Sequence, residues 1–251
     1  MKLKNRRIVV TGASSGIGLE VVRLFETEGA RLALMSRDEA PLQAALASLR
    51  NPDQHCAVTV DCTDPEAVAA AVEEANGTLG GLDGLVHSAG RDHIAPFAET
   101  TLTAWRDVMD ANITSAYLMS QACVPALRAA GGGTIVTMAS GAALSPLAGR
   151  TAYCTAKAGL VMFSKTLALE LASDNIRVNA LCPGAIDTPM LRSTAGGEHG
   201  DPVPAEIVAR FAMGRIGEAD EIARATLFLT SEDSSFVTGV ALAADGGRTF
   251  H

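Results

Sequence analysis

Short apolar runs alternate with helical segments along the whole chain, and this alternation restricts the possible folds more than any other feature of the sequence. We expect strands at residues 6–11, 31–36, 56–60, 85–88, 134–138, 177–181 and 240–244. Apolar residues recur at helical spacing between these runs, and helices are expected at residues 16–28, 38–49, 65–76, 101–129, 151–172 and 218–229. Strands that are apolar throughout and alternate with helices are typical of a parallel sheet covered on both faces. The sequence therefore predicts an α/β fold, with residues 1–251 forming a single doubly wound domain around a mainly parallel seven-stranded sheet.

Composition restricts the possible partners. Hydrophobic residues make up 48% of the 251 residues, which is enough for a large core. The formal net charge is −8, so we expect no nucleic-acid partner and no anionic membrane surface. No apolar run reaches the roughly 18 residues of a membrane helix. The run that follows the basic N-terminus, Ile8 to Val10, is too short for a signal peptide, and we expect a cytoplasmic protein.

The cysteines point to neither a metal site nor a disulfide framework. There are 5 of them, an odd number, and no CxxC occurs. We expect free thiols in a reducing compartment and no bound metal.

A glycine-rich turn, TGASSGIG at residues 11–18, joins the first strand to the first helix. Three glycines allow a tight turn and a close approach of backbone to a pyrophosphate, and the helix start supplies free amides and a positive dipole end. This arrangement predicts a Rossmann-type dinucleotide site, although the same glycines would also suit a purely structural turn. The predicted contacts in this turn are Gly12, Ser14, Ser15, Gly16, Ile17 and Gly18.

The end of the second strand bears on the choice of dinucleotide. A site for NAD usually has a carboxylate at this position, where this chain has Ser36 followed by Arg37. A guanidinium suits a 2′-phosphate, so the sequence favours NADP(H), with NAD(H) as the alternative. Asp38 is one residue too late for the ribose and is expected to cap the next helix.

Three later strand ends complete the predicted cofactor site. Asp61 and Cys62 follow the third strand, where Asp61 would either face the adenine or cap the next turn. Ser88, Ala89 and Gly90 follow the fourth strand and are small enough for a flat cofactor to lie against them.

Tyr153 and Lys157 are four residues apart in a predicted helix and therefore share one face. A free phenol has a pKa of about 10, and a nearby cation favours the phenolate and lowers that pKa. Such a pair is suited to proton transfer near neutral pH. Ser140 precedes Tyr153 by thirteen residues and supplies a hydroxyl.

These features together resemble the classical short-chain dehydrogenase/reductase family. The matching stretches follow the family's order over nearly the whole length: TGASSGIG (11–18), the Asp61 turn, HSAG (87–90), Asn112, Ser140, Tyr153 with Lys157, PGAIDT (183–188) and TGVALAADGG (238–247). The combination is far more specific than any one motif. Two departures, Ser88 where the family often has Asn and Ala156 where it often has Ser, affect fine positioning rather than the activity class.

The resemblance implies a catalytic tetrad. Tyr153 would be the general acid/base, Lys157 would lower its pKa and hold the nicotinamide ribose, and Ser140 would polarise the substrate oxygen. Asn112 would hold a water that relays protons to Lys157. The resemblance further implies that Pro183, Gly184, Ile186 and Thr188 lie against the nicotinamide. Read singly, each tetrad residue could have a purely structural role.

The substrate side is expected at three walls, at residues 91–94, 142–147 and 190–213. Its candidate contacts are Ser140, Ala142, Leu147, Tyr153, His93 and Met190. Glycines and apolar residues predict a mobile lid at about 189–213. The mainly small, apolar walls favour an uncharged or partly apolar small-molecule ketone or secondary alcohol.

The sequence thus predicts an NADP(H)-dependent oxidoreductase that interconverts a carbonyl and a secondary alcohol, and the resemblance implies a homotetramer. One alternative is an NAD-dependent dehydrogenase of the same family, similar to 3-oxoacyl reductases or hydroxysteroid dehydrogenases. Another is a non-catalytic, nucleotide-sensing regulator that retains only the fold.

Overall fold

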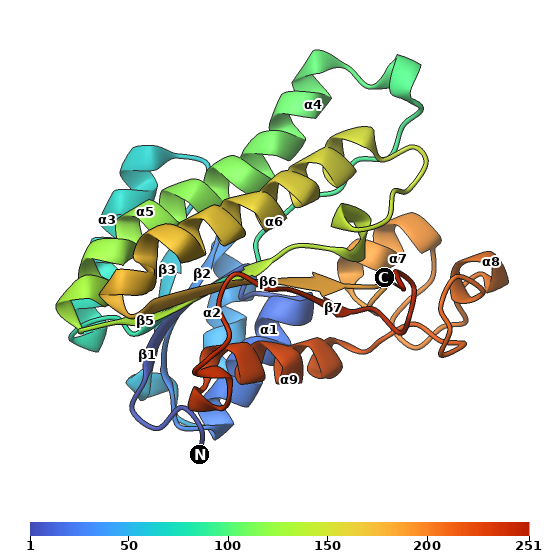
Figure 1. The fold of residues 1–251 in the computed structure, drawn as a ribbon. Helices are drawn as coiled ribbons and strands as arrows, with labels where there is room; N and C mark the ends of the chain where they lie inside the picture. Colours follow the sequence, from blue (N-terminus) through green and yellow to red (C-terminus); the bar gives the residue numbers. More distant parts are fainter. Residues whose placement is uncertain (251) are drawn as a thin grey trace.

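A computed structural model describes residues 1–250 and has the predicted three-layer arrangement, in which helices cover both faces of a central sheet (Figure 1). Within this range the sheet has seven strands, all parallel, in the order β3-β2-β1-β4-β5-β6-β7. The strands are β1 (Arg7–Thr11), β2 (Arg31–Ser36), β3 (Cys56–Thr59), β4 (Gly84–His87), β5 (Gly133–Met138), β6 (Ile176–Pro183) and β7 (Ala241–Ala244). The predicted α/β fold is confirmed.

The helices cover the sheet in two groups. They are α1 (Gly16–Thr27), α2 (Glu39–Ala47), α3 (Pro65–Leu79), α4 (Leu102–Met109), α5 (Ser115–Ala129), α6 (Thr151–Leu171), α7 (Pro189–Ala195), α8 (Ala205–Val208) and α9 (Ala219–Thr230). α1, α2 and α9 pack on one face, and α3, α5 and α6 pack on the other (Figure 1). In β1, Ile8 and Val10 pack in the hydrophobic core beneath α1, α2 and α9, and Val9 packs in the core beneath α3, α5 and α6, because successive strand residues point to opposite faces.

The long helix expected at residues 101–129 is interrupted. α4 ends at Met109, a π-helical turn spans Asp110–Thr114, and α5 begins at Ser115. The Asn112 amide nitrogen donates to the Val108 carbonyl oxygen four residues earlier, at 2.8 Å, and so competes with the helical backbone ladder. A side chain that bonds to the ladder in this way accounts for the widened turn. Periodicity in the sequence cannot reveal it, because the chain remains helical on both sides.

Two further features of the described residues concern the predictions. Asp38 occupies the N-cap position of α2, as predicted, but its side chain makes no capping hydrogen bond. In residues 1–250 we find no helix with the length and apolar character that crossing a bilayer requires.

Candidate active site

A cleft of about 930 Å³ lies along the carboxyl ends of the strands, where the winding of the sheet reverses between β1 and β4. It brings together every residue predicted to contact the cofactor: Gly12, Ser14, Ser15, Gly16, Ile17, Gly18, Ser36, Arg37, Asp61, Cys62, Ser88, Ala89, Gly90, Tyr153, Lys157, Pro183, Gly184, Ile186 and Thr188. The predicted substrate contacts Ser140, Ala142, Leu147, Tyr153 and Met190 line it as well. Elements that are far apart in the sequence therefore form one continuous site.

The glycine-rich turn has the geometry of a dinucleotide cradle. Gly12 has a φ of +65°, and a Cβ there would lie 3.0 Å from the backbone nitrogen of Ala89. A Cβ on Gly18 would lie only 2.1 Å from the carbonyl oxygen of Gly12. Ser15 occupies the N-cap of α1 without a side-chain capping bond, so the amides at the start of this helix point to the cleft without a side-chain partner. These residues fit a bound pyrophosphate, which would accept from those amides.

The ends of β2 and β3 form the adenosine side of the cleft. The hydroxyls of Ser14 and Ser36 are 3.0 Å apart and connect the glycine turn to the end of β2. Arg37 is exposed, and Arg37 and Asp38 both line the cleft. Asp61 accepts from the Thr63 backbone nitrogen at 2.9 Å, and this bond, with a second from the Thr63 hydroxyl, lowers the pKa of Asp61. Asp61 therefore caps the following turn, as one of the two alternatives predicts, and it also lines the cleft.

A buried hydrogen-bonded chain lies beneath the end of β4, and the sequence analysis did not anticipate it. His87, at the end of β4, lies opposite Thr11 of β1 in the strand register. Its Nδ1 is 3.0 Å from the Thr11 hydroxyl and its Nε2 is 3.1 Å from the Ser115 hydroxyl. All three side chains are completely buried.

The partners of these hydroxyls determine the tautomer of His87. The Thr11 oxygen already accepts from the backbone nitrogens of Ser88 and Ala89, both at 3.1 Å, so its own proton is donated to His87 Nδ1. The Ser115 hydroxyl donates to the Ala111 carbonyl at 2.9 Å and accepts from His87 Nε2–H. Burial, followed by the charge of Lys157, lowers the pKa of His87 to about 3. A neutral imidazole therefore orients the Thr11 hydroxyl, which holds the backbone of Ser88 and Ala89 in place along the cleft.

Tyr153, Lys157 and Ser140 converge on this cleft. Lys157 Nζ donates to the Met138 carbonyl at 2.8 Å and lies 5.7 Å from the centroid of the Tyr153 ring. Ser140 accepts from the Ala142 backbone nitrogen at 3.1 Å, which fixes the loop that follows β5. Burial raises the pKa of Tyr153 to about 12, and hydrogen bonding with Ser140 opposes this rise. Burial also lowers the pKa of Lys157 to about 8.

In the chain by itself, burial therefore outweighs the lowering of the Tyr153 pKa that the resemblance implies for Lys157. Both groups are buried, and burial disfavours the charged form of each, so the phenol resists ionisation and the ammonium loses its proton more easily. Additional charge placed in the cleft would be needed to bring the two pKa values towards neutrality.

Asn112 lies behind the cleft wall, next to Lys157. Its two amide hydrogens are donated to the carbonyls of Arg91 and Val108, at 2.7 and 2.8 Å. Its Oδ1 accepts from the Arg91 backbone nitrogen at 3.3 Å and keeps one lone pair for a water. A Cβ on Gly90 would lie 2.7 Å from Asn112 Oδ1 and 3.2 Å from Lys157 Nζ, so only a glycine leaves this space open.

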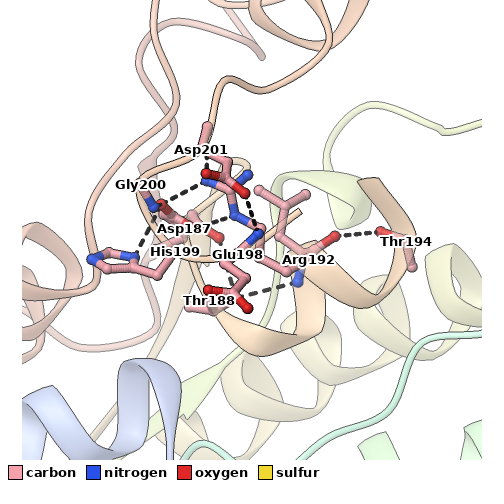
Figure 2. A network of polar contacts seen from close by, with 10 residues as sticks. Asp187, Thr188, Arg192, Thr194, Glu198, His199, Gly200 and Asp201 are labelled. Carbon is pink, nitrogen blue, oxygen red and sulfur yellow. Dashed lines mark hydrogen bonds and ion pairs between the residues drawn. The ribbon is translucent and has the colours of Figure 1, made fainter. Parts of the chain in front are cut away.

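The segment after β6 is held by a network around Asp187 (Figure 2). The buried guanidinium of Arg192 donates to both carboxylate oxygens of Asp187, at 2.7 and 2.8 Å, and the Gly200 backbone nitrogen donates to the same carboxylate at 2.9 Å. Thr188 is the N-cap of α7, and its hydroxyl donates to the Ile186 carbonyl at 3.1 Å. The Arg192 hydrogen bonds, first among several causes, lower the pKa of Asp187 to about 2.

The side chains of Asp187, His199 and Glu218 could also reach a single cation, since their ligand atoms lie within 4.8 Å of one another. Arg192 already occupies both oxygens of Asp187. A guanidinium in this position disfavours a metal ion, and the cluster fits an ion-pair network that attaches α7 to the end of β6.

The substrate end of the cleft differs from the prediction at one residue. Asp92, rather than His93, lines the cleft, together with Arg91 and Ile94. The Asp92 carboxylate pairs with the Arg150 guanidinium at 3.1 Å, and both charges act on Tyr153. Arg210 and Arg248 also line the cleft, and the sequence analysis identified neither. No local pattern distinguishes these arginines from the solvated ones.

Comparison with known proteins agrees with this geometry. Residues 12–249 match the family model described as "Enoyl-(Acyl carrier protein) reductase". The chain is 34% identical to 2-(S)-hydroxypropyl-CoM dehydrogenase 3 of Xanthobacter autotrophicus, over 99% of this chain and 98% of that protein. It is 37% identical to cis-4-hydroxycyclohexanecarboxylate dehydrogenase of Sinomonas cyclohexanicum, over 97% and 96% of the two chains.

A solved structure shows the same fold over the full length. The chain superposes on a short-chain type dehydrogenase/reductase from Mycobacterium marinum with a TM-score of 0.93, at 31% identity, over 100% of this chain and 98% of that one. The chain therefore belongs to the classical short-chain dehydrogenase/reductase family. It is an oxidoreductase of the class that acts on alcohols and ketones with a nicotinamide cofactor.

Proposed function

We propose that the protein interconverts a small ketone and a secondary alcohol with NADP(H), using Tyr153 as the general acid/base. The observation that carries this proposal is the convergence of Tyr153, Ser140 and Lys157 on the cleft that also contains the glycine cradle. The names of the relatives support the class, because they describe dehydrogenases of hydroxylated compounds and, in Chlamydia trachomatis, a 3-oxoacyl-acyl-carrier-protein reductase that is 34% identical.

In the proposed reaction the nicotinamide supplies or accepts the hydride. Ser140 donates a hydrogen bond to the substrate oxygen and orients the carbonyl towards Tyr153. In the direction of reduction, Tyr153 gives its phenolic proton to that oxygen. In the direction of oxidation, the phenolate accepts the hydroxyl proton.

Lys157 has two parts in this proposal. Its buried ammonium stabilises the phenolate. Because burial lowers the pKa of Lys157 to about 8, the ammonium can also give a proton onward, and the resulting neutral amine can accept the next one. A water next to Asn112 Oδ1 would receive that proton. The positive charge of the oxidised nicotinamide would lower the pKa of Tyr153 from its buried value.

Substitution of Tyr153 tests the chemistry. Tyr153→Phe should lower kcat by about 10²- to 10⁴-fold, as expected for the loss of a general acid/base. The other tyrosine, Tyr117, is on the exposed surface of α5 and provides the matched control. Tyr117→Phe should retain full activity when both variants are assayed by cofactor absorbance with a panel of ketones. Equal turnover by Tyr153→Phe would remove Tyr153 from the mechanism, and cofactor binding without turnover by the wild type would favour the regulator.

The preference for NADP(H) is proposed from Arg37. It is exposed beside the adenosine side of the cleft, and its charge acts on Asp61, so it lies where a 2′-phosphate would be placed. Arg37→Asp should lower the ratio of kcat/KM with NADPH to that with NADH by about tenfold or more. Arg50→Asp, at an exposed arginine outside the cleft, is the control. An unchanged ratio in Arg37→Asp would favour the NAD-dependent alternative.

A homotetramer is proposed from the surface of α6. Met162 and Leu169 are 61% and 82% exposed on this helix, although they are apolar. Pairing of α6 with its counterpart in another subunit would cover both. Light scattering should give a mass four times that of the 25.9 kDa chain, and Leu169→Lys should lower the mass.

A further inference from the structure

The guanidinium of Arg248 lies at the substrate end of the cleft, close to the proposed catalytic serine. A Cβ on Gly141, the residue after Ser140, would be only 3.2 Å from Arg248 Nη1. Arg248 Nη2 donates to the Ser145 carbonyl at 3.1 Å. The side chain is therefore held against residues 141–145, the loop that forms one of the substrate walls, and it is partly buried.

Arg248 has no carboxylate partner among residues 1–250. The nearest candidate, Asp245, accepts instead from the backbone nitrogens of Thr249 and Gly247, at 2.9 and 3.0 Å. Both carboxylate oxygens of Asp245 therefore accept hydrogen bonds from the backbone of the turn that follows it. A partly buried cation that is held only by carbonyl groups retains most of its capacity to bind an anion.

Two other arginines lie in the same part of the cleft. Burial lowers the pKa of Arg248, Asp245 opposes this shift, and the positive charges of Arg210 and Arg150 reinforce it. Arg150 is paired with Asp92 at 3.1 Å, whereas the exposed Arg210 has no ion-pair partner in the described part of the chain. Like charges destabilise one another, and an anion bound between Arg248 and Arg210 would relieve this repulsion.

The backbone positions Arg210 beside Arg248. The next residue, Phe211, is 6% exposed and packs against Gly184 and Gly246. The Met213 backbone nitrogen donates to the Gly246 carbonyl at 3.1 Å, which connects the segment that bears Arg210 to the segment that bears Arg248. The carboxylates of Asp107 and Asp110 also line the cleft, from α4 and the π turn, as does Arg91 after β4.

We infer that Arg248 and Arg210 form a subsite for an anionic group, a carboxylate or a phosphate, on the ketone or alcohol substrate. This inference rests on the proposed function and deepens it. It differs from the expectation of an uncharged or partly apolar substrate, because the tertiary structure brings two guanidiniums without an ion pair among residues 1–250 to walls that appear apolar in the sequence. A substrate bound in this way would have its anion at Arg248 and its oxygen at Ser140 and Tyr153.

Matched pairs of ketones test the inference. Levulinate is compared with methyl levulinate, and dihydroxyacetone phosphate with dihydroxyacetone, so that each pair differs in the anionic group. The wild type should use one anionic member at least about tenfold more efficiently, measured by kcat/KM, than its neutral counterpart. The pair that shows the difference distinguishes a carboxylate from a phosphate.

Three variants and one control test whether Arg248 and Arg210 cause the preference for the anionic ketone. In Arg248→Gln and Arg210→Gln the ratio of efficiencies, anionic over neutral, should fall by about tenfold or more. Arg248→Lys keeps the charge and should keep part of the ratio. Arg128 is an exposed arginine of α5 that pairs with Asp174, and Arg128→Gln should leave the ratio unchanged.

A binding measurement separates failure of the inference from failure of the proposed function. Levulinate and dihydroxyacetone phosphate are titrated into the wild type and Arg248→Gln with cofactor present, and the thermal shift is recorded. A shift by either anion that is lost in Arg248→Gln supports the subsite even if no ketone is reduced, in which case only the proposed function fails. Turnover with equal ratios in the wild type and all variants, or no anion-dependent shift in the wild type, would overturn the inference.

Discussion

The buried imidazole of His87 gives the protein a pH-dependent stability whose size follows from its surroundings. Both ring nitrogens are engaged: Nδ1 accepts from Thr11 and Nε2 donates to Ser115. A second proton on Nδ1 would face the Thr11 hydrogen. To accept it, the Thr11 hydroxyl would have to rotate and give up one of the backbone amides of Ser88 or Ala89 that it now accepts from.

The magnitude comes from the two pKa values of His87. The pKa is about 3 in the native protein, against 6.5 for a histidine free of such surroundings. Below a pH of about 6.5, His87 binds a proton in the unfolded chain but stays unprotonated in the native protein. The free energy of unfolding therefore falls as the pH falls. The stabilisation is complete above the unfolded pKa and is lost progressively from about pH 6.5 to about pH 3. Between neutral pH and about pH 5, the titration of His87 lowers the free energy of unfolding by about 2 kcal/mol.

Denaturant unfolding at about pH 7.5 and about pH 5 measures this loss. Fluorescence of the single tryptophan and circular dichroism provide two probes, at one fixed protomer concentration. Other groups titrate in this range, including His55, whose pKa burial also lowers. Comparison with His87→Asn removes their contribution, because both proteins share them and Asn does not titrate.

The wild type should lose about 2 kcal/mol more than His87→Asn between the two pH values. The absolute stability of the variant does not enter this difference. An equal loss in both proteins would show that His87 titrates normally in the native state, and the deduced direction of the hydrogen-bonded chain would then be wrong.

Two further predictions concern the space at the end of β4 and the segment after β6. In Gly90→Ala the new methyl group would meet Asn112 Oδ1 at 2.7 Å and Lys157 Nζ at 3.2 Å. We expect kcat to fall by about tenfold or more and the free energy of unfolding to fall by about 1–3 kcal/mol. An unchanged kcat would mean that the site tolerates the displacement. Asp187→Asn should leave the buried Arg192 without its ion pair. Hydrogen exchange of the α7 amides should then accelerate, while that of the β5 amides stays the same. Unaltered exchange in α7 would argue against a lid attached through this pair.

Much of the fold and of the cofactor site could be predicted because the determinants are local. The apolar run of β1, the glycine turn and the helical stripe of α1 are consecutive in the chain, and their order alone predicts a strand, a turn and a helix. The spacing of Tyr153 and Lys157 places both on one face of α6 for the same reason. Since parallel strands end at one edge of the sheet, predicting the strands also predicted which loops meet there.

The features that were missed depend on contacts between residues distant in the chain. Asp92 and Arg150 pair across 58 positions, as their numbers show, and the Arg248 carbonyl contacts join the last turn of the chain to the loop after β5. Nothing near any of these residues in the sequence marks them. The π turn at Asn112 was missed because helical periodicity on both sides hides it.

The sequence by itself determined the order of elements, the glycine cradle and the set of reactive side chains that reach the cleft. The tertiary structure alone decided their electrostatic state: burial raises the pKa of Tyr153, His87 is neutral, and Arg248 is without a carboxylate partner among the described residues. The physical reason is that a pKa and an ion pair depend on distance and on the exclusion of water, and both are set by segments that come together only on folding.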